Sequence, residues 1–176
     1  MMVRIGREVR PEFNVVLAYD EITGGMRAKE CFDELTRLHG ELFKFNCQLW
    51  NFELMRKPEL FEAAAQDAAK AEMMVIATRR SEAISGEAER WIENWVRSKG
   101  AGRDAILVLL SGKGAATGSG PGMRLRKMAE PWGVTFLCKE VGWPAQTASP
   151  MPHEARPRPA FAASAGAGQP RWGLNE

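Results

Sequence analysis

The sequence has few of the residues that common catalytic and metal sites require. Its 176 residues include only two histidines and three cysteines, and the cysteines lie far apart at Cys31, Cys47 and Cys138. A Ser–His or Cys–His catalytic pair is therefore not expected. The odd, scattered cysteines favour neither a disulfide framework nor a zinc site. We expect each of them to be a small buried apolar side chain.

Two classes of partner are also disfavoured by what is missing. No apolar run approaches the roughly 20 residues that a membrane-spanning helix needs. Residues 1–12 lack the apolar core of a secretory signal. The net charge is only +2 and no block of lysine or arginine stands out, which argues against nucleic acid as a partner. We therefore expect a cytoplasmic protein that binds neither membrane nor nucleic acid.

What the sequence does contain is a regular alternation of apolar strands with helical patterns. The strand patterns recur at intervals of roughly thirty residues, the size of one strand–helix unit. Such alternation predicts an α/β fold with helices on both faces of a parallel sheet. We expect a doubly wound, flavodoxin-like sandwich with five parallel strands in the order 2-1-3-4-5. The predicted strands cover about 13–19, 45–50, 73–78, 105–110 and 134–138, and the predicted helices about 25–40, 58–71, 86–99 and 122–130.

The composition divides the chain into three parts. Residues 1–12 are expected to form a flexible arm, and residues 13–143 the α/β domain. Residues 144–176 are rich in proline, alanine and glycine. Such a segment buries too little apolar surface to offset the entropy of ordering it, so we expect a disordered tail.

The ligand crevice of an open parallel sheet lies at the carboxyl ends of the strands, where the strand order reverses. In the predicted order this place is between the first and third strands. Polar and aromatic residues follow each strand toward that edge. The predicted crevice residues are Asp20, Glu21, Trp50, Asn51, Thr78, Arg79, Ser111, Lys113 and Lys139.

The sharpest feature of this set is the pair of adjacent carboxylates, Asp20 and Glu21. Such a pair can hold a hard divalent cation, so Mg²⁺ at these two residues is one hypothesis. The alternative is structural: Asp20 caps the turn and Glu21 faces solvent.

The layout resembles the receiver domain of two-component response regulators over about residues 13–140. In that family an acidic pair binds magnesium, a hydroxyl residue ends the fourth strand and a lysine ends the fifth. On this chain the resemblance assigns those places to Asp20 with Glu21, Ser111 and Lys139. The family's phosphoryl-accepting aspartate ends the third strand. Here Ala77 or Thr78 stands at that place, and neither carries a carboxylate, so the resemblance implies a pseudo-receiver.

A second resemblance is to flavodoxins, whose first loop wraps the phosphate of flavin mononucleotide (FMN). Thr23, Gly24 and Gly25 keep part of that loop, and Trp50 is a candidate to stack on the flavin ring. The amino terminus of a helix is a suitable anion site. Against this, Asp20 and Glu21 stand where the loop carries hydroxyl residues, and each carboxylate repels a phosphate by about 1 kcal/mol even in water-like surroundings.

Large apolar side chains form a broad arc on the third predicted helix. Trp91 and Trp95 dominate this arc, and exposed aromatic patches mark interfaces. We therefore expect a protein partner or a homodimer at this helix, with burial in the core as the alternative.

Our leading hypothesis is a non-enzymatic signalling or protein-interaction module that resembles a phosphorylation-deficient receiver and requires no cofactor. The alternative is a small FMN- or nucleotide-binding protein.

Overall fold

The computed structural model describes residues 9–79, 84–100, 104–112 and 120–143. The chain divides into two units, Met1–Pro144 and Ala145–Glu176, and every described residue belongs to the first. Most of the predicted N-terminal arm, the whole predicted tail and Lys113 lie outside the described residues.

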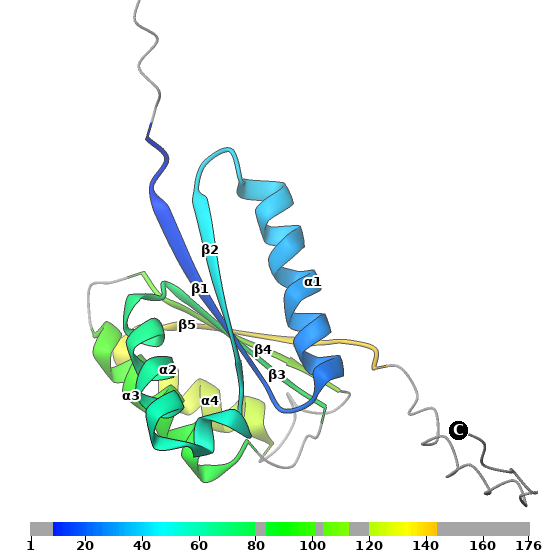
Figure 1. The fold of residues 1–176 in the computed structure, drawn as a ribbon, viewed down its shortest axis with the longest axis vertical. Coiled ribbons are helices and arrows are strands. Elements are labelled where there is room, and N and C mark those ends of the chain that lie inside the picture. The colour runs from blue at the N-terminus through cyan, green and yellow to red at the C-terminus, as the bar shows by residue number, and fades with distance from the viewer. Residues whose placement is uncertain (1–8, 80–83, 101–103, 113–119, 144–176) are drawn as a thin grey trace, which may run out of the picture. The chain divides into compact units, whose positions relative to one another are not determined.

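The core of the fold is a single parallel sheet in the order β2-β1-β3-β4-β5. This confirms the predicted strand order and the flavodoxin-like layout (Figure 1). The central strands are apolar because both of their faces are covered. β3 is buried at all of its six positions. The strands are β1 Glu12–Tyr19, β2 Lys44–Asn51, β3 Met73–Thr78, β4 Ile106–Ser111 and β5 Thr135–Glu140.

The helices cover the two faces unequally. α1 connects β1 to β2 in one direction across the sheet, whereas the later connections run in the other direction. Right-handed crossovers therefore place α1 on one face and α2, α3 and α4 on the other, as Figure 1 shows. The α-helices are α1 Ile22–His39, α2 Pro58–Lys70, α3 Gly86–Lys99 and α4 Pro121–Ala129, and two 3₁₀ helices span Leu54–Arg56 and Glu130–Trp132. No helix in the described ranges is long and apolar enough to cross a bilayer.

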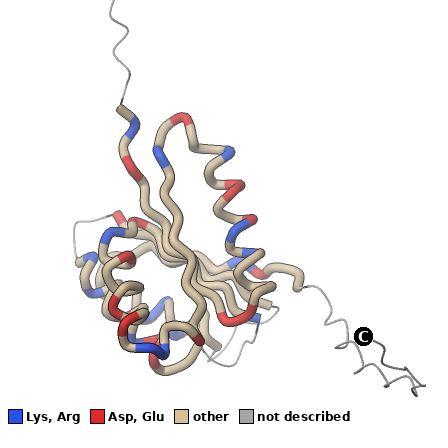
Figure 2. Tube along the Cα trace, in the orientation of Figure 1, with Lys and Arg blue, Asp and Glu red and all other residues tan. Residues whose placement is uncertain are grey.

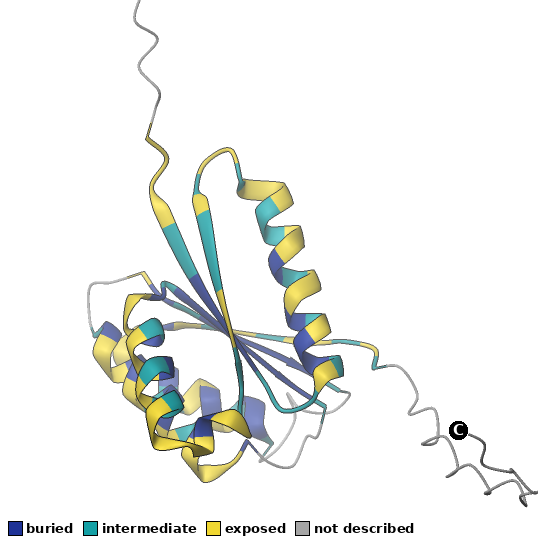
Figure 3. Ribbon diagram, viewed as in Figure 1, coloured by how far each residue is buried: buried dark blue, intermediate teal, exposed yellow. Residues whose placement is uncertain are grey.

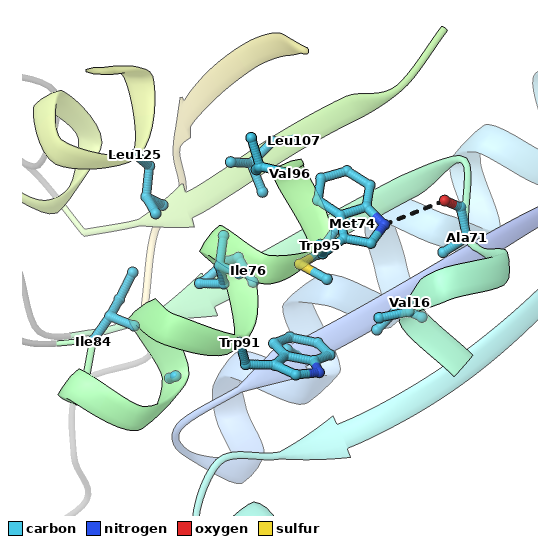
Figure 4. Packing of buried hydrophobic residues seen from close by; sticks show 14 of the residues in the cluster. Val16, Ala71, Met74, Ile76, Ile84, Trp91, Trp95, Val96, Leu107 and Leu125 are labelled. Carbon is cyan, nitrogen blue, oxygen red and sulfur yellow. Dashed lines mark hydrogen bonds between the residues drawn. The ribbon is translucent and has the colours of Figure 1, made fainter. Parts of the chain in front are cut away.

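The expectation of an exposed aromatic surface on α3 is wrong. Trp91 and Trp95 are both 2% exposed and lie in the core between the helix and the sheet (Figure 4). The indole nitrogen Nε1 of Trp95 donates a hydrogen bond to the Ala71 carbonyl over 3.3 Å. The arc is wide because α3 contacts α2 on one side and α4 on the other, in addition to the sheet. Neither indole is available to a partner.

Two boundaries differ from the prediction in ways that affect the site. α1 begins at Ile22, three residues before the predicted start, so the glycines of the expected loop belong to its first turns. β5 continues to Glu140, so Lys139 lies inside the strand and does not follow it.

Candidate functional site at the carboxyl edge of the sheet

Asp20 leaves the end of β1 and is held by hydrogen bonds from its own surroundings. The hydroxyl of Thr78 donates to one carboxylate oxygen, Oδ2, over 2.8 Å. The backbone N–H of Glu21 donates to the other, Oδ1, over 2.7 Å. Hydrogen bonds to a carboxylate are worth about 1.5–3 kcal/mol, roughly twice a neutral bond. Asp20 therefore links the end of β1 to the end of β3 through hydrogen bonds.

Thr78 is, with Ala77, one of the two positions at which the resemblance to receiver domains would place a phosphoacceptor. It is the last residue of β3, is 1% exposed and directs its hydroxyl at Asp20. The prediction that this position lacks a carboxylate follows from the sequence. Its contact with Asp20 does not, because only the fold brings these two residues together.

Gly24 and Gly25 allow α1 to approach the sheet closely. A Cβ on Gly24 would lie 3.1 Å from the Ala77 carbonyl oxygen, and one on Gly25 would lie 3.2 Å from the ring of Tyr19. Only Asp20 and Glu21 separate β1 from α1. The two glycines therefore belong to helix packing, and the chain has no loop here long enough to wrap a phosphate. Thr23, Gly24 and Gly25 therefore lie in the first turns of α1 and not in the expected loop, and their assignment to FMN binding stays a prediction.

The crevice itself is filled by Trp143, which follows β5. Its ring atom Cη2 lies 3.2 Å from the position that a Cβ on Gly24 would take. Its ring atoms Cδ1 and Nε1 lie 3.6 Å from the corresponding position at Gly112. The indole therefore spans from the start of α1 to the end of β4, across the point where the strand order reverses. We did not predict this role, because Trp143 stands next to the composition change that we assigned to the tail.

Three buried polar atoms in this region lack a hydrogen-bonding oxygen or nitrogen among the described residues. They are Thr23 Oγ1, Trp143 Nε1 and Ser111 Oγ, of which the Ser111 hydroxyl has the Cys138 thiol as its partner. Leaving such a group unpaired typically costs about 1–3 kcal/mol. The closed crevice is thus held by apolar contact and is not saturated with hydrogen bonds.

Ser111 is fully buried at the end of β4, and its neighbour is the thiol of Cys138. Burial raises the pKa of the Cys138 thiol, and a hydrogen bond with the Ser111 hydroxyl offsets part of that rise. The Ser111 carbonyl accepts a 2.9 Å bond from the backbone N–H of Val141, which leads the chain toward Trp143. Ser111 therefore lies at the carboxyl edge, where its contacts with Cys138 and Val141 hold neighbouring parts of the fold together.

Trp50 and Asn51 do not contribute to a common pocket with the first turns of α1. The Trp50 indole packs against the cluster on the α2–α4 face, and its Nε1 donates to Asp67 Oδ2 over 3.2 Å. α1 covers the opposite face, so the expectation that Trp50 stacks on a flavin beside Gly24 is wrong. Asn51 Oδ1 accepts a 2.8 Å bond from the Glu53 N–H and shapes the turn after β2.

Lys139 is also absent from the crevice. It lines a cavity of about 410 Å³ on the α1 face, together with Arg27, Glu30 and Cys31. Burial raises the pKa of the Cys31 thiol, and the positive charge of Lys139 offsets part of that rise. The assignment of Lys139 as the receiver-like lysine is therefore wrong. Arg79 remains at the edge, where its carbonyl oxygen lies 3.2 Å from the Cβ position of Gly112.

The three cysteines are half-buried and unpaired. Burial raises the pKa of the Cys47 thiol to about 11. Within the described ranges, no three side chains of His, Cys, Asp or Glu lie close enough together to hold a metal ion. Asp20 and Glu21 would therefore have to bind Mg²⁺ without a third such side chain, in competition with the hydrogen bonds of Asp20.

The sequence matches no protein-family model, and a search of curated protein sequences finds no significant match. The fold is flavodoxin-like, and the carboxyl edge carries the residues described above.

Proposed function

We propose that the protein is a non-enzymatic regulatory or protein-interaction module, similar to a receiver domain that has lost its phosphoacceptor. The observation that carries this proposal is the hydrogen bond between Thr78 and Asp20. The acceptor, Asp20, is the acidic residue that a receiver would use to bind magnesium. The donor, Thr78, stands where a receiver would carry its phosphoacceptor.

The position of Trp143 supports the same proposal. A ligand at the switch point would have to displace an indole that contacts both Gly24 and Gly112. Displacing it would expose apolar surface, at a cost of roughly 25 cal/mol for each Å². A crevice that is closed in this way favours a module that acts through its outer surface.

The chemistry of the edge agrees with this interpretation. Asp20 accepts a hydrogen bond from Thr78, and both Thr78 and Ser111 are buried. Lys139 lines a cavity on the α1 face of the sheet. A general base needs to reach a substrate proton within about 3 Å. Within the described ranges, no group of three or more His, Cys, Asp or Glu side chains gathers at this edge to hold a metal ion.

Incubation with acetyl phosphate and Mg²⁺ tests the proposal, with intact-mass measurement and peptide mapping as the readout. We expect no phosphoryl group on the peptide that contains β3. A Mg²⁺-dependent phosphoryl adduct mapped to β3 or to Asp20 would overturn the proposal. A Thr78→Val variant, treated in parallel, shows whether any adduct formed at the Thr78 hydroxyl.

A further inference from the structure

The outer edge of β2 is long and carries almost no protection against pairing with another strand. β2 has eight residues, and its only charged residue is Lys44 at the start, which forms an ion pair with Glu12 over 2.9 Å. Figure 2 shows the rest of the strand without charge. Edge strands that stay unpaired usually carry inward charges, prolines or bulges. β2 has none of these after Lys44.

The hydrogen-bonding groups at this edge can be identified from the register with β1. The backbone N–H of Lys44 donates to Pro11, and that of Phe52 donates to Tyr19, both over 2.9 Å. In a parallel ladder such bonds involve alternate residues. The N–H and C=O groups of the residues between them therefore point to the open side. Those residues are Phe45, Cys47, Leu49 and Asn51.

A groove lies beside this edge on each face of the sheet. On the α1 face, Leu49 with Ile22 and Met26 of α1 lines an apolar groove of about 430 Å³. These three side chains are 47%, 77% and 60% exposed. On the other face, a polar groove of about 500 Å³ is lined by Asn46, Gln48, Asp67 and Lys70, among others. A strand added at this edge would therefore need apolar side chains on one face and polar side chains on the other.

β2 itself has this pattern. Phe45 and Cys47 pack on the α1 face, whereas Trp50 packs on the α2–α4 face. Strand alternation then places Asn46 and Gln48 with Trp50. An antiparallel pair related by a two-fold axis perpendicular to the sheet keeps the α1 faces of both copies on the same side.

We propose that a second copy of this chain pairs with β2 through its own β2, in antiparallel orientation, and continues the sheet. Centring the axis on Cys47 places Phe45 of one copy opposite Leu49 of the other, and Asn46 opposite Gln48. The two Lys44 residues then lie at opposite ends of the interface. Cross-strand pairs of these kinds stabilise the pairing of antiparallel strands.

The charged residues beside the apolar groove are compatible with the same two-fold axis at Cys47. Lys29 and Asp33 of α1 pair with each other and are the charged groups that act on the Cys47 thiol. Rotation about a two-fold axis at Cys47 brings Lys29 of one copy to the end of the interface at which the other copy carries Asp33. The polar groove likewise carries both signs, from Asp67 and Lys70. The pairing rests on the β2 edge alone and does not depend on the closed crevice.

Sedimentation velocity of the full chain over a micromolar concentration range tests this proposal. We expect a dimer that Leu49→Lys weakens by roughly 100-fold in Kd, because both copies carry the change. The matched control is Leu137→Lys, on the opposite edge strand β5, where the leucine is 51% exposed and the dimer is expected to persist. Circular dichroism establishes that both variants fold.

Amide hydrogen exchange of the wild-type chain gives a second readout that needs no variant. We expect the amides of Phe45, Cys47 and Leu49 to exchange more slowly as concentration rises. A wild-type chain that stays monomeric overturns the proposal. So does a dimer that survives Leu49→Lys, or one that Leu137→Lys dissociates. If Leu49→Lys fails to fold, Gln48→Lys at the exposed position next to it replaces it, with the same expected effect.

Discussion

Replacing Thr78 by aspartate places a second carboxylate where the structure has a hydroxyl that donates to Asp20. The two groups are joined by a 2.8 Å hydrogen bond, and Thr78 is 1% exposed. The substitution removes a charge-assisted bond worth about 1.5–3 kcal/mol. It also adds repulsion of about 4 kcal/mol for charges ~4 Å apart at an effective dielectric constant of ~20. Partial relaxation reduces the sum, and we expect the free energy of unfolding to fall by about 3–5 kcal/mol.

Urea unfolding in the presence of a chelator measures this loss. Thr78→Asn is the matched control, because an amide of the same size can still donate to Asp20. We expect it to lose less than half as much stability as Thr78→Asp. Adding Mg²⁺ should restore stability to Thr78→Asp but not to Thr78→Asn, since only the former supplies a second carboxylate beside Asp20. An aspartate variant as stable as the wild type without divalent cations would refute the contact between Asp20 and Thr78.

Three further predictions test Trp143 at the site and two side chains elsewhere in the fold. Trp143→Ala should lower the free energy of unfolding by about 1–3 kcal/mol. This is less than the loss of a fully buried tryptophan would cost, because the Trp143 indole is half-buried. Added indole should raise the melting temperature of this variant alone. Trp95→Phe should cost about 1–3 kcal/mol in urea unfolding, because the Ala71 carbonyl loses its indole donor. The Cys47 thiol, with a pKa of about 11 against 9.0 for a free thiol, should be alkylated roughly 100-fold more slowly than a free thiol at pH 8. Alkylation at the free-thiol rate would contradict the burial of Cys47.

Burial of Cys47 also has a consequence for stability at high pH. Its pKa is raised on folding, so its contribution is complete below pH 9 and is lost as the pH rises toward 11. The wild type should therefore lose more stability over this range than Cys47→Ser does, as measured by urea unfolding at each pH.

The strand–helix layout could be predicted because each β-strand is an apolar run and each connection has helical periodicity. β3 and α3 begin and end at the predicted residues, since abrupt changes in composition flank both of them. Right-handed crossovers leave few topologies for such a chain, and the strand order that we chose among them is confirmed. The start of α1 was missed because Gly24 and Gly25 indicate a loop by propensity, whereas here they permit close packing against Ala77 and Tyr19.

The site was predictable only as far as strand ends determine it. Asp20, Thr78 and Ser111 reach the carboxyl edge as expected, because they directly end or follow β1, β3 and β4. Trp50 was placed on the wrong face. Counting alternation from the apolar Phe45 and Cys47 would have assigned it to the opposite side. Lys139 was assigned to the crevice because β5 was predicted to end two residues too early.

Trp143 could not have been assigned from periodicity. A single tryptophan after the last strand has no repeat that reveals the face it covers. The only available signal is its position, because a residue directly after β5 lies near the carboxyl edge at which the crevice opens. The buried arc of α3 was ambiguous for a different reason. Contacts with two neighbouring helices bury as wide a stripe as an interface would require.

We propose that the crevice is closed by the protein's own side chains and does not hold a flavin. Titration of the purified full chain with FMN, followed by the visible flavin spectrum and by tryptophan fluorescence, tests it most directly. We expect no saturable binding at millimolar FMN. Saturable binding at micromolar FMN that is lost in Gly24→Asp would contradict the claim. It would also mean that Trp143 leaves the crevice and that the protein carries a redox cofactor.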